Sequence, residues 1–142
     1  MIAYDKPVVF DTHVWFWLAV GDTELVKSST MKRLIDQLHR YKLNISAITH
    51  WEISMLEAKG RITLKVDCLN WLTESIRKTK VHVVGLTPEI SVTSNRLPGD
   101  FHGDPADRII VATTRLINGI LLTRDDRILR YGSKGFVDTL KV

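Results

Sequence analysis

Five acidic side chains occupy positions at which they can meet in one site. They are Asp11, Glu52, Asp104, Asp107 and Asp125. Carboxylates at close range repel one another and retain protons unless a cation neutralises them. Oxygen ligands with few available His or Cys partners suit Mg²⁺ or Mn²⁺. Such a site supports metal-assisted cleavage of a phosphodiester, so this chemistry is the first hypothesis.

Two of the acids also have an ordinary structural interpretation. Asp11 directly follows the apolar run "VVF", and Asp125 ends "GILLTRD". An aspartate in such a place commonly caps the helix that follows a strand. Capping is therefore the simpler reading of either residue taken alone.

The stretch "GDPADRIIVATT" separates capping from function more clearly. Asp104 precedes Pro105 and is a good N-cap with proline at the first helical position. Asp107 also complements the helix dipole. However, it begins a helical stripe that continues through Ile110, Val111 and Thr114. We therefore expect Asp107 to point inward, which capping does not require.

Glu52 lies in a helix predicted over residues 49–62, on a stripe shared with Ile48, Met55 and Leu56. This stripe is predicted to face the core, which puts a carboxylate at the margin of an apolar face. Because a buried carboxylate is costly unless it is paired or binds a metal, Glu52 is either functional or ion-paired with an arginine.

Hydrophobic periodicity and turn residues predict how these acids are positioned. Strands are predicted over 6–12, 42–48, 81–86 and 119–125, with a possible edge strand at 135–140. Helices are predicted over 13–22, 23–41, 49–62, 66–80, 87–97, 105–118 and 126–132. Alternating strands and helices predict one α/β domain, residues 1–142, with a parallel sheet covered on both faces. In such folds ligands bind beyond the carboxyl ends of the strands.

Composition excludes several other classes of protein. The net charge of +4 is compatible with a polyanionic partner but is weak evidence for one. The single cysteine, Cys68, excludes a disulfide framework, and the five histidines lack metal-ligand spacing. No phosphate-binding glycine loop is present. No signal segment opens the chain and no apolar run is long enough to cross a membrane, so we expect a cytoplasmic protein. Haloacid-dehalogenase-like phosphatases need a second Asp where this chain has His13.

Four segments together resemble a known family. "VVFDTHVWFWL", "SAITHWEISMLEAKGRI", "GDPADRIIVATTRL" and "LLTRDDRIL" are similar, in order and spacing, to the motifs of PIN-domain ribonucleases, and most of all to VapC toxins. The resemblance covers nearly the whole chain. It implies a PIN-like three-layer sandwich, with a mostly parallel central sheet of four to five strands and helices on both faces.

The resemblance also implies roles for individual residues. The four family acids correspond to Asp11, Glu52, Asp107 and Asp125, and Asp104 is an additional acid of the third motif. The implied metal ligands are Asp11, Asp104, Asp107 and Asp125. The polar residues implied to orient the carboxylates are Thr12, Ser46, Thr49 and Thr123.

The implied activity is Mg²⁺- or Mn²⁺-dependent endonucleolytic cleavage of RNA (tRNA, rRNA or mRNA), which stops translation. The implied partners are a second copy of the chain and a VapB-like antitoxin that lays a helix in an apolar groove. The run "VWFWL" at 14–18 is apolar on every face, which packing explains as well as a groove or dimer surface does. The alternative function is a non-catalytic PIN-like module that binds RNA or protein.

Basic residues near the third and fourth motifs are candidates for contacts with RNA phosphates. They are Arg108, Arg124 and Arg127, although solvated faces or carboxylate pairing also explain such residues. His13 and His50 adjoin motif residues and either line the RNA path or have a packing role.

Overall fold

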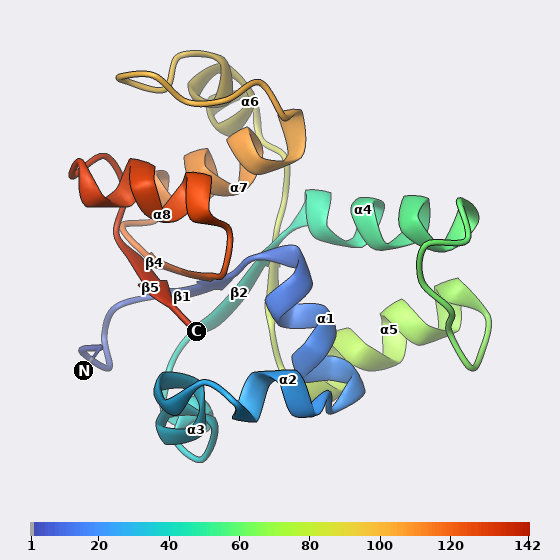
Figure 1. The fold of residues 1–142 in the computed structure, drawn as a ribbon. Coiled ribbons are helices and arrows are strands. Elements are labelled where there is room, and N and C mark those ends of the chain that lie inside the picture. Colours follow the sequence, from blue (N-terminus) through green and yellow to red (C-terminus); the bar gives the residue numbers. More distant parts are fainter. Residues whose placement is uncertain (1) are drawn as a thin grey trace.

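The computed structural model describes residues 2–142 and contains a five-stranded parallel sheet with the order β3-β2-β1-β4-β5 (Figure 1). The strands are β1 (Val8–Phe10), β2 (Leu43–Ser46), β3 (His82–Val84), β4 (Ile120–Thr123) and β5 (Thr139–Lys141). β1 pairs with both β2 and β4, so it lies at the centre of the sheet. The predicted parallel α/β fold is confirmed, although the edge strand begins four residues later than predicted.

Helices connect the strands and cover the sheet. They are α1 (Thr12–Val20), α2 (Thr23–Val26), α3 (Ser29–Ile35), α4 (Ala47–Ala58), α5 (Cys68–Thr79), α6 (Pro88–Asn95), α7 (Pro105–Leu116) and α8 (Asp126–Ser133), with a short 3₁₀ helix, η1 (Leu38–Arg40). Within residues 2–142, none of these helices is long and apolar enough to cross a bilayer.

The strand side chains alternate between two hydrophobic clusters, one on each face of the sheet. In β1, Val8 and Phe10 join one cluster and Val9 the other. In β4, Leu122 and Leu121 divide in the same way. The first cluster includes buried residues of α1, α2 and α3, and the second includes buried residues of α6, α7 and α8. Because successive side chains of a strand point to opposite faces, this division makes a three-layer sandwich.

The continuous helix predicted over 23–41 is wrong. Asp22 accepts a hydrogen bond from the Glu24 amide and caps α2, while Ser28 accepts from the Met31 amide and caps α3. Aspartate and serine side chains compete with the helical hydrogen-bond ladder in this way and begin new helices. The apolar spacing was nevertheless informative, since Met31, Leu34 and Leu38 are all buried in the core.

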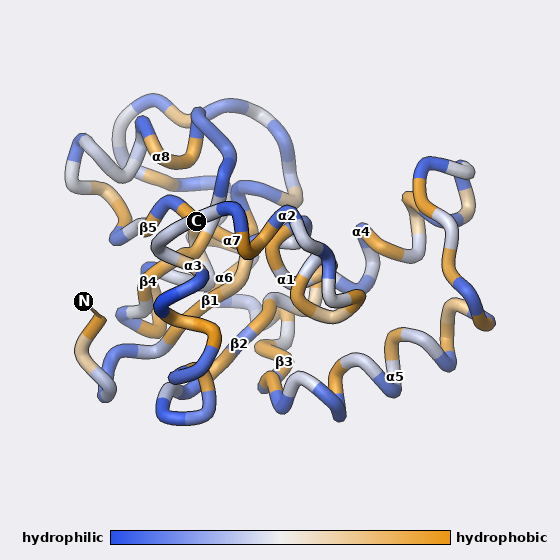
Figure 2. The backbone as a smooth tube through the Cα atoms, turned by 60° about the horizontal axis from the view of Figure 1, so that its bottom comes forward, coloured by the Kyte–Doolittle hydropathy of each residue, from blue (hydrophilic) through white to orange (hydrophobic). Residues whose placement is uncertain are grey.

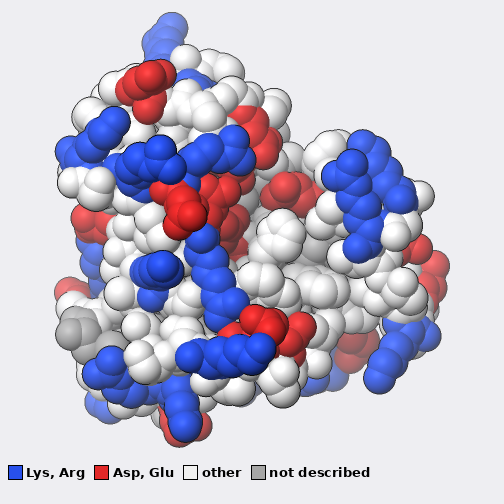
Figure 3. Space-filling model, viewed as in Figure 1, with Lys and Arg blue, Asp and Glu red and all other residues white. Residues whose placement is uncertain are grey.

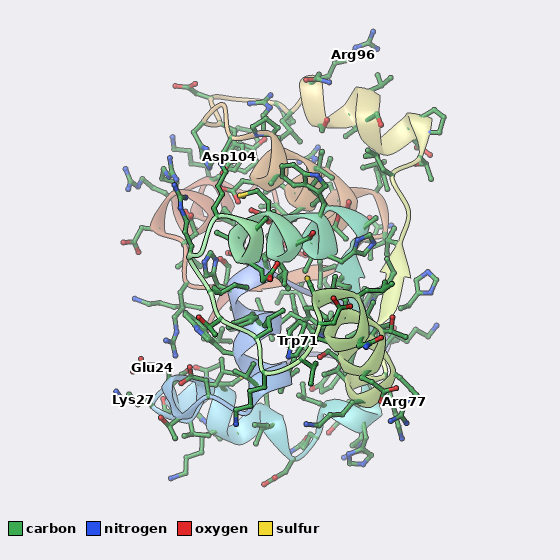
Figure 4. All side chains as sticks on the ribbon, turned by 90° about the vertical axis from the view of Figure 1, so that its right-hand side faces the viewer. Glu24, Lys27, Trp71, Arg77, Arg96 and Asp104 are labelled. Carbon is green, nitrogen blue, oxygen red and sulfur yellow. The ribbon has the colours of Figure 1, made fainter. Side chains whose placement is uncertain are left out.

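The apolar run at 14–18 belongs to α1 and packs into the core. Trp15 is fully buried, and Trp71 of α5 meets it edge-on, with ring centroids 5.8 Å apart. Phe16 also contacts Trp71, at 5.4 Å between centroids. Figure 4 shows Trp71 directed from α5 toward α1, and Figure 2 shows apolar segments recurring along α5. Packing against the sheet and α5 therefore accounts for much of this run.

Candidate active site

A cavity of about 300 Å³ lies beyond the carboxyl ends of β1 and β4. All five acids singled out from the sequence line it: Asp11, Glu52, Asp104, Asp107 and Asp125. Figure 3 shows acidic side chains gathered in this hollow, with a row of basic side chains over α8 beside it. The fold thus brings together residues that are as much as 114 positions apart in the chain.

Three of the acids are helix N-caps as well as cavity residues. Asp11 caps α1, Asp104 caps α7 by accepting from the Ala106 amide, and Asp125 caps α8. The N-termini of these three helices therefore meet at the cavity. Since a helix N-terminus carries partial positive charge, this arrangement offsets part of the repulsion among the carboxylates.

Asp11 is the most firmly held of the acids. Its Oδ1 accepts from the Thr12 amide at 2.8 Å, and its Oδ2 accepts from the Thr123 hydroxyl at 2.7 Å. The Asp125 amide donates in turn to the same Thr123 hydroxyl, at 3.0 Å. Burial raises the pKa of Asp11 above its usual range, while the hydrogen bonds from Thr123 and Thr12 oppose that rise. Thr123 therefore links the acids that follow two adjacent strands.

Glu52 is held by the hydroxyl of Thr12, which also contacts the hydroxyl of Thr49. Thr12 Oγ1 lies 2.5 Å from Glu52 Oε1 and donates to it, and the hydroxyls of Thr12 and Thr49 are 3.1 Å apart. Ser46, the remaining polar residue singled out beside Glu52, caps α4 by accepting from the Ile48 amide. Burial raises the pKa of Glu52, and the nearby acids raise it further.

The predicted stripe on α4 was wrong in one respect. The fully buried residues of this helix are Thr49 and Ile53, while Glu52 is half-buried beside them. Within residues 2–142, no Lys, Arg or His side chain lies within ion-pair distance of Glu52, so the proposed arginine pair does not form. The carboxylate faces the cavity instead.

Asp107 is the acid whose charged form the protein stabilises least. It is only 8% exposed and lies on the inward stripe predicted for α7, whose other members are buried. Burial, followed by the charges of the other four acids, raises the pKa of Asp107 to about 8. In the described part of the chain, no group donates a hydrogen bond to it with good geometry. An acid in this state is the one that a cation would stabilise most.

His102 lies beside Asp107 and was missed as a site residue. Its Nε2 is 3.2 Å from Asp107 Oδ2, and its Nδ1 accepts from the Asp104 amide at 3.3 Å. Because Nδ1 accepts, the proton of the neutral ring is on Nε2, facing Asp107. Nε2 is buried and has no aligned acceptor within residues 2–142. The metal-ligand spacings that we searched for among the histidines cannot reveal a His–Asp pair formed by a loop.

The donor set of the cavity fits a hard divalent cation. Its five acidic residues offer carboxylate oxygens, which are hard ligands, and burial raises the pKa of Asp11, Glu52 and Asp107. In the part of the chain that the structure describes, no three potential ligands yet converge closely enough to hold an ion. A bound divalent cation would offset the mutual repulsion of these carboxylates.

The three arginines considered for RNA contacts lie in different environments. Arg108 donates to the carbonyls of Ser94, Phe101 and His102, so it anchors the loop before α7. Arg124 donates to the carbonyls of Glu24 and Val142 and stacks over the Trp17 ring, although it also lines the cavity. Arg127 is exposed at the cavity rim. We therefore retain only Arg127 as a candidate phosphate contact.

The two histidines that adjoin motif residues also differ. His13 is exposed and lines the acid cavity, close enough to lower the pKa of Asp11 and Glu52 slightly. His50 is half-buried and is not among the residues that line this cavity.

Comparison with known proteins agrees with this geometry. The model of the PIN domain family matches residues 8–134. Ribonuclease VapC22 of Mycobacterium tuberculosis is 35% identical over 121 residues, covering 85% of this chain and 88% of that protein.

Solved structures share the fold at lower sequence identity. VapBC2 from Rickettsia felis, bound to a DNA fragment from its promoter, matches with a TM-score of 0.66 and 10% identity over 96% of this chain and 99% of that one. A toxin–antitoxin complex from Klebsiella pneumoniae matches with a TM-score of 0.55 and 22% identity over 83% and 86%. By its matched residues and by its relative, this chain belongs to the PIN domain family and resembles VapC.

Proposed function

We propose that this protein is a divalent-metal-dependent endoribonuclease that acts as the toxin of a VapBC-type pair. The observation that carries the proposal is the cavity into which five carboxylates project, with the pKa of Asp107 raised to about 8. Several partly buried carboxylates at close range reduce the stability of a folded protein unless a cation binds between them. Similarity to a ribonuclease supports RNA as the substrate.

The carboxylates divide into two roles. Asp11, Asp104, Asp107 and Asp125 are the proposed cation ligands. When bound, Mg²⁺ or Mn²⁺ supplies charge neutralisation and Lewis acidity for hydrolysis of an RNA phosphodiester. Glu52 uses Oε1 to accept from Thr12, which leaves Oε2 to take the proton of the attacking water. Thr12 and Thr123 keep Glu52 and Asp11 in place.

The same similarity supports partners for this chain. A VapB-like antitoxin is proposed because solved structures with this fold include VapBC and toxin–antitoxin complexes. A homodimer and translation arrest by cleavage of tRNA, rRNA or mRNA are further parts of the proposal. They are tested by the mass of the purified protein in solution and by sequencing the cut ends of cellular RNA.

The decisive experiment incubates a mixed RNA pool with purified protein in Mg²⁺, in Mn²⁺ and in EDTA, beside Asp11→Asn. Cleavage that requires metal and disappears in Asp11→Asn supports the nuclease. The substitution keeps the shape of the side chain and an oxygen that can accept from Thr123, so the fold is expected to persist. Equal cleavage by both proteins would overturn the mechanism.

The alternative is a non-catalytic module that binds RNA or protein. Such a module has no need of a cation, so its RNA affinity should be the same in Mn²⁺ and in EDTA. An unchanged affinity together with no cleavage of any RNA in the pool would favour this second function.

A further inference from the structure

A second cavity, of about 210 Å³, adjoins the acid cavity and has the opposite charge. Arg127 lines both cavities, so the two are neighbours at that side chain. Asp100 is the sole acid among the residues that line the second cavity. We call it the α8 cavity.

Its basic side chains form a line along one helix. Arg127, Arg130 and Lys134 are spaced i, i+3 and i+7, so they share one side of α8 and its C-terminal end. All three are exposed, and Figure 3 shows basic side chains in a row over this helix. Within residues 2–142, Arg130 and Lys134 form no ion pair, and the Arg127–Asp125 separation is a loose 3.9 Å. Their charges are free to meet an outside anion.

An aromatic wall stands beside these cations. Phe101 is half-buried, with its ring centroid 4.7 Å from that of Tyr131 and 4.3 Å from that of His102. The Tyr131 hydroxyl donates to the Pro98 carbonyl, and Arg108 holds the carbonyl of Phe101. These contacts fix the wall in place before any ligand arrives. A basic track next to an aromatic surface is the combination that binds single-stranded nucleic acid.

The geometry points to the α8 cavity as a subsite for single-stranded RNA next to the scissile phosphodiester. We propose that Arg130 and Lys134 bind phosphates of the strand leaving the acid cavity, while a base lies against Phe101. A line of cations about two helical turns long matches a chain of phosphates better than one small anion. This inference rests on the proposed function, because it takes the acid cavity as the place where RNA is cut.

The test compares two double variants of the full chain with the wild type. Arg130→Gln/Lys134→Gln neutralises the α8 cavity, and Lys32→Gln/Lys78→Gln makes the same change of net charge at exposed positions on α3 and α5. The probe is a fluorescent, unstructured oligouridylate of about twelve nucleotides. Its binding is measured by anisotropy in EDTA, so that no cleavage occurs, over a series of salt concentrations.

The α8 variant should bind the probe about tenfold more weakly at low salt, and its slope of log affinity against log salt should be smaller by about 1.4, at roughly 0.7 for each lost phosphate contact. The control variant should keep wild-type affinity and slope. An equal loss in both variants, no loss in the α8 variant, or no binding by the wild type would overturn the subsite.

A separate measurement isolates the nuclease proposal. Bis-p-nitrophenyl phosphate is too small to extend from the acid cavity along α8, so its Mn²⁺-dependent hydrolysis tests the acid cavity alone. Failure of the wild type to hydrolyse this diester would count against the nuclease, whereas the anisotropy comparison would still decide the subsite.

Discussion

Thr123 Oγ1 donates a 2.7 Å hydrogen bond to Asp11 Oδ2, from the end of one central strand to the end of its neighbour. The same hydroxyl accepts from the Asp125 amide, so one fully buried side chain sets the positions of two proposed cation ligands. Loss of a group that orients a metal ligand commonly lowers metal affinity by about 10- to 100-fold.

Replacing this hydroxyl should therefore weaken the site. We expect Thr123→Val, which keeps the shape of the side chain, to lower Mn²⁺ affinity or RNA cleavage by about 10- to 100-fold. The loss of a hydrogen bond that lowers the pKa of Asp11 adds to this effect. Thr123→Ser, which restores the hydroxyl, should recover most of the activity. Calorimetric titration with Mn²⁺ measures the affinity, and wild-type affinity in Thr123→Val would contradict the role of the hydroxyl.

The stability of the metal-free protein should depend on pH through Asp107. Its pKa rises from 3.8 in the unfolded chain to about 8 in the fold, so between these values the folded state binds more protons. The free energy of unfolding contributed by this group is therefore greatest below about pH 4 and falls as pH rises toward 8. In EDTA, the melting temperature of the wild type should decline over this range more steeply than that of Asp107→Asn. Parallel curves would contradict the raised pKa.

His102 should limit the positions that the Asp107 carboxylate can take, because the two side chains are in contact although no aligned hydrogen bond joins them. Its Nε2 faces Asp107 Oδ2 at 3.2 Å, while the Asp104 amide occupies Nδ1. We expect His102→Ala to reduce Mn²⁺ affinity by about tenfold, as loss of a group that orients a metal ligand commonly does. His82→Ala, an exposed residue of β3, is the matched control and should change nothing. Equal affinities for both variants would refute the positioning role.

Arg108 should matter for stability rather than for RNA contact. Its guanidinium binds three backbone carbonyls of the segment from α6 to α7, at 2.8, 2.9 and 3.1 Å. We expect Arg108→Ala to reduce the free energy of unfolding by about 1–3 kcal/mol, because partly buried carbonyls lose their donors. Urea unfolding measures this change. Its counterpart Arg127→Ala, at the exposed rim, should leave unfolding unaltered and weaken RNA binding instead.

The fold was largely predictable because its signals are local. Each buried strand is a short apolar run, and Asp11, Thr87 and Asp104 stand immediately before helices that they do cap. The inward direction of Asp107 also followed from helical spacing. The break after α2 did not, because the apolar spacing used for the prediction, which includes Met31, Leu34 and Leu38, lies wholly after it, and the capping by Ser28 was not recognised.

The rest of the site depends on loop conformation, which no periodic pattern encodes. The contact between His102 and Asp107 forms because the segment before α7 folds back, and Arg108 holds it there through backbone carbonyls. Backbone carbonyls are the same for every residue type, so the sequence does not show which of them Arg108 binds. The direction of Glu52 was similarly uncertain, since it depends on Thr12, forty residues earlier in the chain.

The position of β4 has a consequence for synthesis of the protein. This strand, which ends just before Asp125, is inserted beside the first strand, although it is synthesised after β2 and β3. A nascent chain that has emerged only as far as α7 lacks both Thr123 and Asp125, and its Asp11 has no side-chain donor from the neighbouring strand. The acid cavity is therefore completed only once the chain has emerged from the ribosome as far as Asp125. Premature termination products should accordingly be inert.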